Sequence, residues 1–521
     1  MDIRKYPIGI QDFEDIRTGN YVYVDKTAFI YSLVSEGKPY FLSRPRRFGK
    51  SLLLSTLKAY FEGKKELFSG LAIAELEKEW LSYPVFHLDF NLGDYRRPGG
   101  LDLALDSNLR QLEEIWGENP KDIAFSNRFQ GLIRRAAEKA GRKVVVLIDE
   151  YDKALLAIDD EKKRDEARDT LRAFYGVLKS ADPYLKFYLI TGITKFAKVS
   201  IFSDLNQLFD ISLMEEYASL CGITPTELLD YFTGDIKALA EKNNMTFDQA
   251  MAEMQRRYNG YHFAEDTPGV YNPFSVLNTL KKKKFHYYWF ETGTPAFLVK
   301  TLANIDYNPE KLKSRVTISA NSVMDYRFED TNPVPILYQS GYLTIKSYDP
   351  DLEEFTLGFP NGEVEYGFLN ELLPAYSPWV KGNREELSVR SLIKDLDAHN
   401  IDSFMTRLRA LFSGIPYPLT EQSEYHYQSL LYLVFALMGE FAQAEVAGAA
   451  GRSDMVIMRR ETVYVFEFKL SGNGTAEEAL RQIDEKGYLL PYSAEGKRLL
   501  KVGVEFDREK RTIGKWLLRE G

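Results

Sequence analysis

Cysteine is nearly absent from this chain of 521 residues, in which Cys221 is the single example. One cysteine cannot form an internal disulfide or a zinc–cysteine cluster, so the fold is built on neither. Histidine is also scarce: there are five, they are scattered, and no two have the spacing of a metal-binding pair. These shortages exclude a disulfide-stabilised scaffold and a structural zinc site.

Long apolar runs and an excess of positive charge are lacking as well. The N-terminus has no apolar core of the signal-peptide kind, and the longest strongly apolar run, residues 430–439, is too short to span a bilayer. We therefore expect a cytoplasmic protein with no membrane partner. The formal net charge is −9, so any nucleic-acid-binding surface must be local. The four lysines at 281–284 are a candidate, although a solvated surface would carry the same run.

Aromatic residues, by contrast, are abundant, with 33 tyrosines and 33 phenylalanines, which favours large folded cores over disorder. At about 150 residues per domain, the length predicts roughly three to four domains. Strand-like and helix-like segments alternate over residues 1–215, and residues 216–300 are mainly helical. The segment 301–385 is mixed, and a final block, 386–521, contains helices, a hairpin and a closing strand.

Several strands can be predicted within these segments. The stretches GRKVVVLIDEYDK and LKFYLITGIT each contain an unbroken apolar run, which is typical of strands covered on both faces and indicates a parallel sheet in an α/β domain. In the mixed segment, residues 336–349 and 353–368 resemble strands joined by turns.

The stretch RPRRFGKS, residues 44–51, ends like a phosphate-binding loop, but Arg44 occupies the position of the first glycine. Such a loop needs backbone N–H groups, a helix N-terminus and a lysine that reaches the phosphates. Gly49, Lys50 and Ser51 can supply the close approach, the charge and a magnesium-binding hydroxyl, between an apolar strand and a helical segment. A GKS triplet alone is weak support, because it occurs often by chance.

Polar residues end two of the predicted buried strands. Asp149 and Glu150 follow one apolar run, and Thr191 and Thr194 lie at the end of another. Carboxylates at the carboxyl edge of a parallel sheet face the crevice where ligands bind. One carboxylate could hold Mg²⁺ through water and the next could orient or deprotonate an attacking water, while a threonine could contact the γ-phosphate. Each of these strand ends alone could be an ordinary acidic or polar turn. Taken together with the loop, the strand-end residues favour a nucleotide site.

The stretches YPIGIQDFEDIR, FLSRPRRFGKS and LIDEYDK together resemble the AAA-ATPase-like family. In that family the arginine-rich loop is the usual form of the phosphate-binding motif, so Arg44 is a regular feature. The resemblance implies an ATP site in which Lys50 contacts phosphate, Ser51 binds Mg²⁺, Asp149 is the acidic metal partner and Glu150 is the catalytic carboxylate. We assign Thr191 to the same site.

Further stretches, RRYNGYHF, YNPFSVL and FETGTPAFL, are similar to the same family and imply a helical lid beside the nucleotide. Four arginines could stabilise developing phosphate charge, within the chain or from a neighbouring subunit. Surface or structural ion pairing is the simpler account of each one. They are Arg46, Arg47, Arg256 and Arg257.

The final block carries a second group of charged residues. Period-two geometry places Val463, Val465, Glu467 and Lys469 on one strand face, where two charges among apolar residues need a reason. A structural Glu–Lys pair is one reason and a metal site is another. A hairpin can bring Asp454 beside Glu467, two carboxylates can hold Mg²⁺, and Lys469 could help to deprotonate the metal-bound water.

This D…ExK pattern and its surroundings resemble the PD-(D/E)xK nuclease superfamily, in the form often fused behind the same ATPase family. Upstream acids at Glu424 and Glu445 and the helical Gln482 belong to the resemblance, whereas Ser453 stands where proline is common. The resemblance implies catalysis by Asp454, Glu467 and Lys469, with Mg²⁺, or alternatively Mn²⁺, at the two acids.

We therefore predict an α/β protein whose leading function is ATP binding and hydrolysis coupled to a metal-dependent nuclease, with DNA favoured over RNA as partner. The alternative is a nucleotide-dependent switch or scaffold whose nuclease-like domain only binds a partner. A homo-oligomer is left open. The predicted domains are a P-loop AAA-type ATPase core (1–215), a helical lid (216–300), a small mixed, winged-helix-like region (301–385) and a restriction-endonuclease-like α/β domain (386–521).

Overall fold

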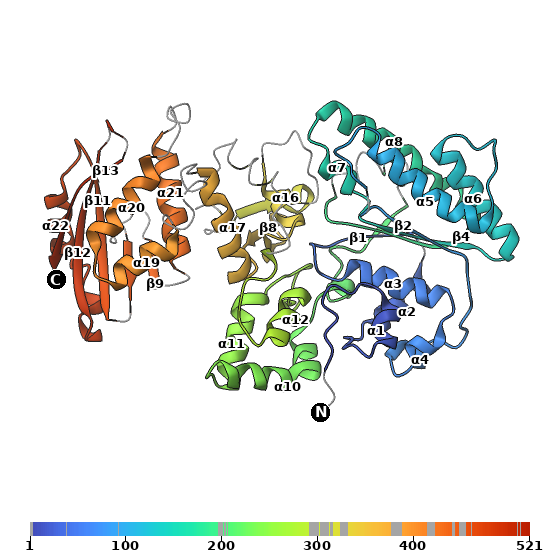
Figure 1. Ribbon diagram of the computed structural model, residues 1–521, viewed down its shortest axis with the longest axis horizontal. Helices are drawn as coiled ribbons and strands as arrows, with labels where there is room; N and C mark the ends of the chain where they lie inside the picture. Colours follow the sequence, from blue (N-terminus) through green and yellow to red (C-terminus); the bar gives the residue numbers. More distant parts are fainter. Residues whose placement is uncertain are drawn as a thin grey trace. The chain divides into compact units, whose positions relative to one another are not determined.

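A computed structural model gives the arrangement of the chain (Figure 1). Two compact units make up the chain: Met1–Glu291 with Val316–Asn361, and Thr292–Arg315 with Gly362–Gly521. The residues that the structure describes are 4–37, 39–91, 93–195, 202, 205, 207–290, 298, 302, 312, 316–323, 332–376, 388–413, 423–439, 443–446, 455–459, 461–507, 509–510 and 512–521.

The first unit is built on a parallel five-stranded sheet, which confirms the predicted fold class for this part of the chain. Strand β4 lies between β1 and β3, so the strand before the glycine-rich loop and the strand ending in Asp149 are both its neighbours. The strands in spatial order are β2 (Val85–Asp89), β3 (Val144–Asp149), β4 (Leu185–Gly192), β1 (Pro39–Ser43) and β5 (Phe209–Asp210).

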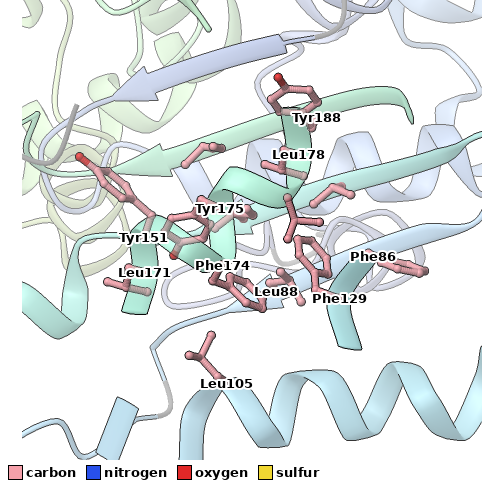
Figure 2. Packing of buried hydrophobic residues seen from close by; sticks show 14 of the residues in the cluster. Phe86, Leu88, Leu105, Phe129, Tyr151, Leu171, Phe174, Tyr175, Leu178 and Tyr188 are labelled. Atoms are coloured by element: carbon pink, nitrogen blue, oxygen red, sulfur yellow. The ribbon is translucent and has the colours of Figure 1, made fainter. Parts of the chain in front are cut away.

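Helices cover both faces of this sheet (Figure 1). All six residues of β3 are buried, as the unbroken apolar run predicts. Figure 2 shows the core on one face, where Phe129 and Phe174 stack with ring centroids 4.6 Å apart beside Leu88. That face carries α5 (Gly100–Trp116), α6 (Phe125–Ala140) and α8 (Glu161–Ser180), and the other carries α2 (Thr27–Glu36) and α3 (Lys50–Phe61). Shorter helices are α1 (Phe13–Thr18), α4 (Ala72–Leu76) and α7 (Lys153–Ala157).

Three further helices of this unit form a bundle with its own apolar core: α10 (Pro225–Lys242), α11 (Phe247–Tyr258) and α12 (Pro273–Lys282). Thr224 and Thr246 begin the first two with capping boxes. The N-terminal segment packs into this bundle, because the Tyr6 hydroxyl donates to Asp235 (2.5 Å) and Lys26 pairs with Glu227 (2.7 Å). The YPIGIQDFEDIR region therefore ties the bundle to the sheet.

A small antiparallel sheet completes the first unit, with the order β6 (Val316–Ser319), β8 (Glu354–Gly358) and β7 (Thr344–Asp349). The helices α15 (Ala320–Val323) and α16 (Val334–Gln339) precede β7. The strand prediction for 336–339 is wrong, because a short, wholly buried apolar run does not distinguish a strand from a helix.

In the second unit, the predicted strand continuation over 362–368 is also wrong, since these residues begin helix α17 (Gly362–Tyr376). Its buried Val364, Phe368 and Leu372 recur every four residues, which is a helical period.

The rest of the second unit is a mixed five-stranded sheet flanked by helices, in agreement with the predicted α/β class. The predicted hairpin is confirmed by β10 and β11, and β11 runs parallel to β12. In spatial order the strands are β13 (Thr512–Glu520), β12 (Arg498–Asp507), β11 (Thr462–Leu470), β10 (Met455–Met458) and β9 (Gln443–Val446). Helix α22 (Ala476–Glu485) covers one face, and α19 (Val389–Asp397), α20 (Ile401–Ser413) and α21 (Ser423–Met438) cover the other (Figure 1).

None of the helices that the structure describes combines the length and the apolar character that crossing a bilayer requires.

Candidate functional site

The loop between β1 and α3 has the geometry of a phosphate-binding turn. Gly49, which precedes α3, has φ = +97°, a left-handed conformation that glycine adopts without strain. Helix α3 begins at Lys50, whose buried Nζ donates to the carbonyl oxygens of Arg44 (2.9 Å) and Pro45 (3.2 Å). The ammonium thus lies under the loop, next to the helix N-terminus that an anion would approach.

Three predicted site residues from three strands or helices meet at the carboxyl edge of the sheet. The Ser51 hydroxyl donates to Asp149 Oδ2 (2.5 Å), and the Thr191 hydroxyl donates to Asp149 Oδ1 (2.8 Å). Because β4 lies between β1 and β3, both hydroxyls can reach one carboxylate. Asp149 and Thr191 are buried, so these bonds are shielded from water. The fold thus brings together Ser51 and Thr191, which are about 140 residues apart in the sequence.

Glu150 follows at the end of β3 in a left-handed conformation (φ = +52°), and its carboxylate pairs with Lys153 at 2.9 Å. Burial alone raises the pKa of Glu150. The positive charges of Lys50, Lys153 and Arg46 outweigh burial and hold that pKa below its ordinary value. The carboxylate is therefore ionised at neutral pH, as a group that accepts a proton from water must be.

The second candidate site lies on β11. Glu467 is buried, and Lys469 Nζ lies 3.4 Å from its Oε1. Gln482 of α22 donates to Glu467 and accepts from Lys469, so the three side chains form one hydrogen-bonded group. Val463 and Val465 pack against α22 on the same strand face, which confirms the predicted alternation.

A glycine allows α22 to approach this group. Gly503 of β12 pairs with Glu467, and a side chain at this position would lie 2.2 Å from the Ala476 carbonyl oxygen. Asp454 lies outside the described residues; β10 begins at the next residue, Met455, which pairs with Phe466. The two upstream acids of the resemblance lie in regular elements: Glu424 is in α21 and Glu445 is in β9.

Comparison with known proteins bears on both sites. Residues 7–202 match the family described as predicted AAA-ATPase, and residues 422–516 match the PD-(D/E)XK nuclease superfamily. An uncharacterized protein in the vnfD 5' region of Azotobacter chroococcum mcd 1 is 36% identical over 525 residues, covering 98% of each chain. The chain belongs to this family of AAA-ATPase-like proteins with a C-terminal PD-(D/E)XK domain. No solved structure matches it.

One residue of the AAA-ATPase-like domain escaped the sequence analysis. Asp152 is fully buried and accepts hydrogen bonds from the backbone N–H groups of Ile193 (3.1 Å) and Thr194 (2.7 Å) and from the Thr194 hydroxyl (2.5 Å). Thr194, a candidate phosphate contact, is thus engaged by Asp152, and the burial of Asp152 raises its pKa. Gly192 permits this approach, because an added Cβ would lie 2.8 Å from Asp152 Oδ1. The sequence signal that could have revealed Asp152 is its place as the second aspartate of the LIDEYDK motif.

An apolar pocket beside the loop was also missed. It has a volume of about 110 Å³ and reaches Gly49 and the first turns of α3. Its walls come from several stretches that are far apart in the chain, which is why no local motif reveals it. Among its lining residues are Pro7, Val24, Leu52, Cys221 and Leu277.

The lysine run lies on the surface. Lys281–Lys284 are exposed at and beyond the C-terminal end of α12. Cations are favoured there by the helix dipole, so a solvated surface is sufficient to explain them.

Arg44 has a structural role in this domain. Its guanidinium is buried, donates to the carbonyl oxygens of Ser43 (2.9 Å), Ser212 (2.7 Å) and Tyr217 (3.0 Å), and lies 4.2 Å over the ring of Phe263. The arginine that replaces the first glycine of the motif therefore anchors the loop to residues 212–217.

Arg44→Ala is expected to lower the free energy of unfolding by about 3 kcal/mol or more, since each buried carbonyl left without a donor costs about 1–3 kcal/mol. Urea denaturation followed by circular dichroism measures the change. The control Arg47→Ala removes an exposed side chain and should stay within about 0.5 kcal/mol of wild type. Equal losses in the two variants would refute an anchoring role for Arg44.

Proposed function

We propose that the protein binds and hydrolyses ATP in its AAA-ATPase-like domain and cleaves nucleic-acid phosphodiesters in its PD-(D/E)XK domain, with ATP controlling the cleavage. The observation that carries the proposal is the Ser51–Asp149–Thr191 group beside Lys50 at the carboxyl edge of a parallel sheet. A phosphate–metal site uses the loop hydroxyl and the strand-end carboxylate to hold Mg²⁺.

The donor set fits Mg²⁺. Ser51 and Asp149 offer hard oxygen ligands on neighbouring elements, and Mg²⁺ in such sites takes one or two protein oxygens together with phosphates and water. When bound, the ion neutralises charge that develops on the phosphates. Lys50 would exchange the carbonyls of Arg44 and Pro45 for the β- and γ-phosphates, and the apolar pocket beside Gly49 would take the base.

Glu150 would act on the attacking water. The water oxygen forms a bond to the γ-phosphorus while the bond to the β,γ-bridging oxygen breaks, and ADP leaves with that electron pair. The ionised Glu150 accepts the proton from the water and returns it to solvent. Thr191, bonded to Asp149, keeps that carboxylate oriented.

The PD-(D/E)XK domain would supply the nuclease. Glu467 gives one carboxylate, and Asp454, the residue before β10 in the sequence, would give the other. Two carboxylates suit Mg²⁺ or Mn²⁺ with open positions for phosphate and water. Lys469, next to Glu467, would donate a hydrogen bond to the phosphate or position the attacking water.

The remaining parts complete the proposal. The α10–α12 bundle would be the helical lid of residues 216–300, beside the nucleotide. The 301–385 region would be a winged-helix-like contact for nucleic acid, with DNA favoured over RNA. The closed Glu467–Lys469–Gln482 group also suits the second candidate, a nucleotide-dependent scaffold in which these residues are a structural ion pair.

A cleavage assay separates the two candidates. The full-length protein is incubated with single- and double-stranded DNA and RNA, with Mg²⁺ or Mn²⁺, and with or without ATP. We expect cleavage that Asp454→Ala abolishes and that Lys50→Ala uncouples from ATP. No cleavage of any substrate would favour the scaffold, and equal cleavage by Asp454→Ala would overturn the assignment of the nuclease to this site.

A further inference from the structure

The arginines of the loop and of the α10–α12 bundle differ in the partners of their side chains. Arg44 is engaged by three backbone carbonyls and the Phe263 ring, as described above. Arg47 is exposed, and its Cζ lies 4.9 Å over the ring of Phe274. In the lid bundle, Arg256 and Arg257 both pair with Glu253 of their own helix, the former at 2.8 Å. Each of these four therefore has a structural partner.

Arg46 differs from them. It is half-buried, and within the described part of the chain its guanidinium takes part in no ion pair. Its backbone is fixed on both sides: the preceding carbonyl, of Pro45, accepts from Lys50 Nζ (3.2 Å), and its own carbonyl accepts from Trp289 Nε1 (3.2 Å). Arg46 therefore directly follows the carbonyl that accepts a hydrogen bond from Lys50, the lysine that marks the phosphate position.

The charge of Arg46 also reaches the catalytic side of the site. It is one of the positive charges that lower the pKa of Glu150, together with Lys50 and Lys153. The charge effect on Glu150 and the hydrogen bond from Lys50 to the preceding carbonyl associate Arg46 with both groups that act on the γ-phosphate in the proposed mechanism. A guanidinium is always charged and presents several N–H donors in one plane, which suits the oxygens of a phosphoryl group.

We propose that Arg46 is an in-chain catalytic arginine that contacts the γ-phosphate and stabilises its charge in the transition state of ATP hydrolysis. This inference rests on the proposed ATPase function. As the water oxygen bonds to the γ-phosphorus and the bond to the β,γ-bridging oxygen breaks, the Arg46 guanidinium would stabilise the negative charge that grows on the phosphate oxygens. The chain would thus need no arginine from a neighbouring subunit for hydrolysis.

The test compares Arg46→Ala, Arg46→Lys and the adjacent control Arg47→Ala in the full-length protein. Phosphate release gives kcat, and calorimetry gives the affinity for ATP and for ADP with aluminium fluoride, a transition-state analogue, both with Mg²⁺ present. We expect Arg46→Ala to lower kcat by about 10³-fold or more, the range of arginines that act on transferring phosphoryl groups. It should weaken the analogue by a similar factor and ATP by less than about 5-fold.

Each outcome decides the matter. Partial recovery in Arg46→Lys and near-normal rates in Arg47→Ala would support the assignment. A kcat for Arg46→Ala within about 3-fold of wild type would overturn it while the ATPase stands. Equal losses of affinity for ATP and for the aluminium fluoride analogue, with kcat unchanged, would make Arg46 a ground-state binding residue and overturn the catalytic role. A wild-type protein that binds ATP without turnover would overturn it as well, and one that binds no ATP would overturn the proposed function itself.

Discussion

Glu150→Gln should abolish ATP turnover while ATP binding survives. The substitution keeps the shape of the side chain but removes the proton acceptor for the attacking water, and a positioned base contributes about 10²–10⁴-fold to such a rate. The partner Lys153 still finds an amide oxygen, so the local fold should persist. Phosphate release measures turnover, and calorimetry with ATP and Mg²⁺ measures binding.

The control is Glu161→Gln, which makes the same change at an exposed residue at the start of α8. A Glu150→Gln variant that turns over ATP at the rate of this control would exclude Glu150 as the base.

The pKa of Glu150 gives a related prediction for the acid side of the pH profile. Because Lys50 and its neighbours hold that pKa below the ordinary value of 4.5, the base is ionised throughout pH 5.5–8. Loss of turnover through protonation of Glu150 should therefore have its midpoint below about pH 4.5. A decline centred near pH 6.5 would assign the base to another group.

Glu467→Gln is expected to lower the rate of cleavage by about 100-fold or more. Even residues that only support metal ligands lower metal affinity or activity by about 10–100-fold when they are replaced. An amide keeps the bond network with Lys469 and Gln482 but supplies no charge to a divalent metal. Cleavage of the best substrate found for the wild-type protein measures the loss, at several Mg²⁺ and Mn²⁺ concentrations.

Glu485→Gln in α22 is the control, since its side chain is exposed and close in sequence to Gln482. ATP turnover should be unchanged in both variants. Equal cleavage by Glu467→Gln and Glu485→Gln would show that Glu467 serves a structural pair only.

The parts of the fold that the sequence could predict are those fixed by a local period. Continuous apolar runs predicted the parallel strands β3 and β4, and alternation predicted the face of β11 that carries Glu467 and Lys469. The edge strand β13 was not predicted: its exposed and half-buried positions give no clean alternation. The wholly buried α16 has no polar face, so its period is invisible.

The candidate site shows the same limit. The residue types of Lys50, Ser51 and Asp149 predict phosphate chemistry, but only the strand order explains why Thr191 joins them and Thr194 does not. The roles of the arginines could not be read from the loop, because their partners lie far away in sequence. Arg44, for instance, binds carbonyls of residues 212–217.

Calorimetric titration of ATP with Mg²⁺ into the wild-type protein, Lys50→Ala and Arg47→Ala tests the central claim most directly. We predict one saturable site in the wild-type protein and in Arg47→Ala. Lys50→Ala should bind about 10–100-fold more weakly, since a charge-assisted hydrogen bond contributes about 1.5–3 kcal/mol. Equal affinities in the wild-type protein and Lys50→Ala, or no binding by the wild-type protein, would contradict the nucleotide site.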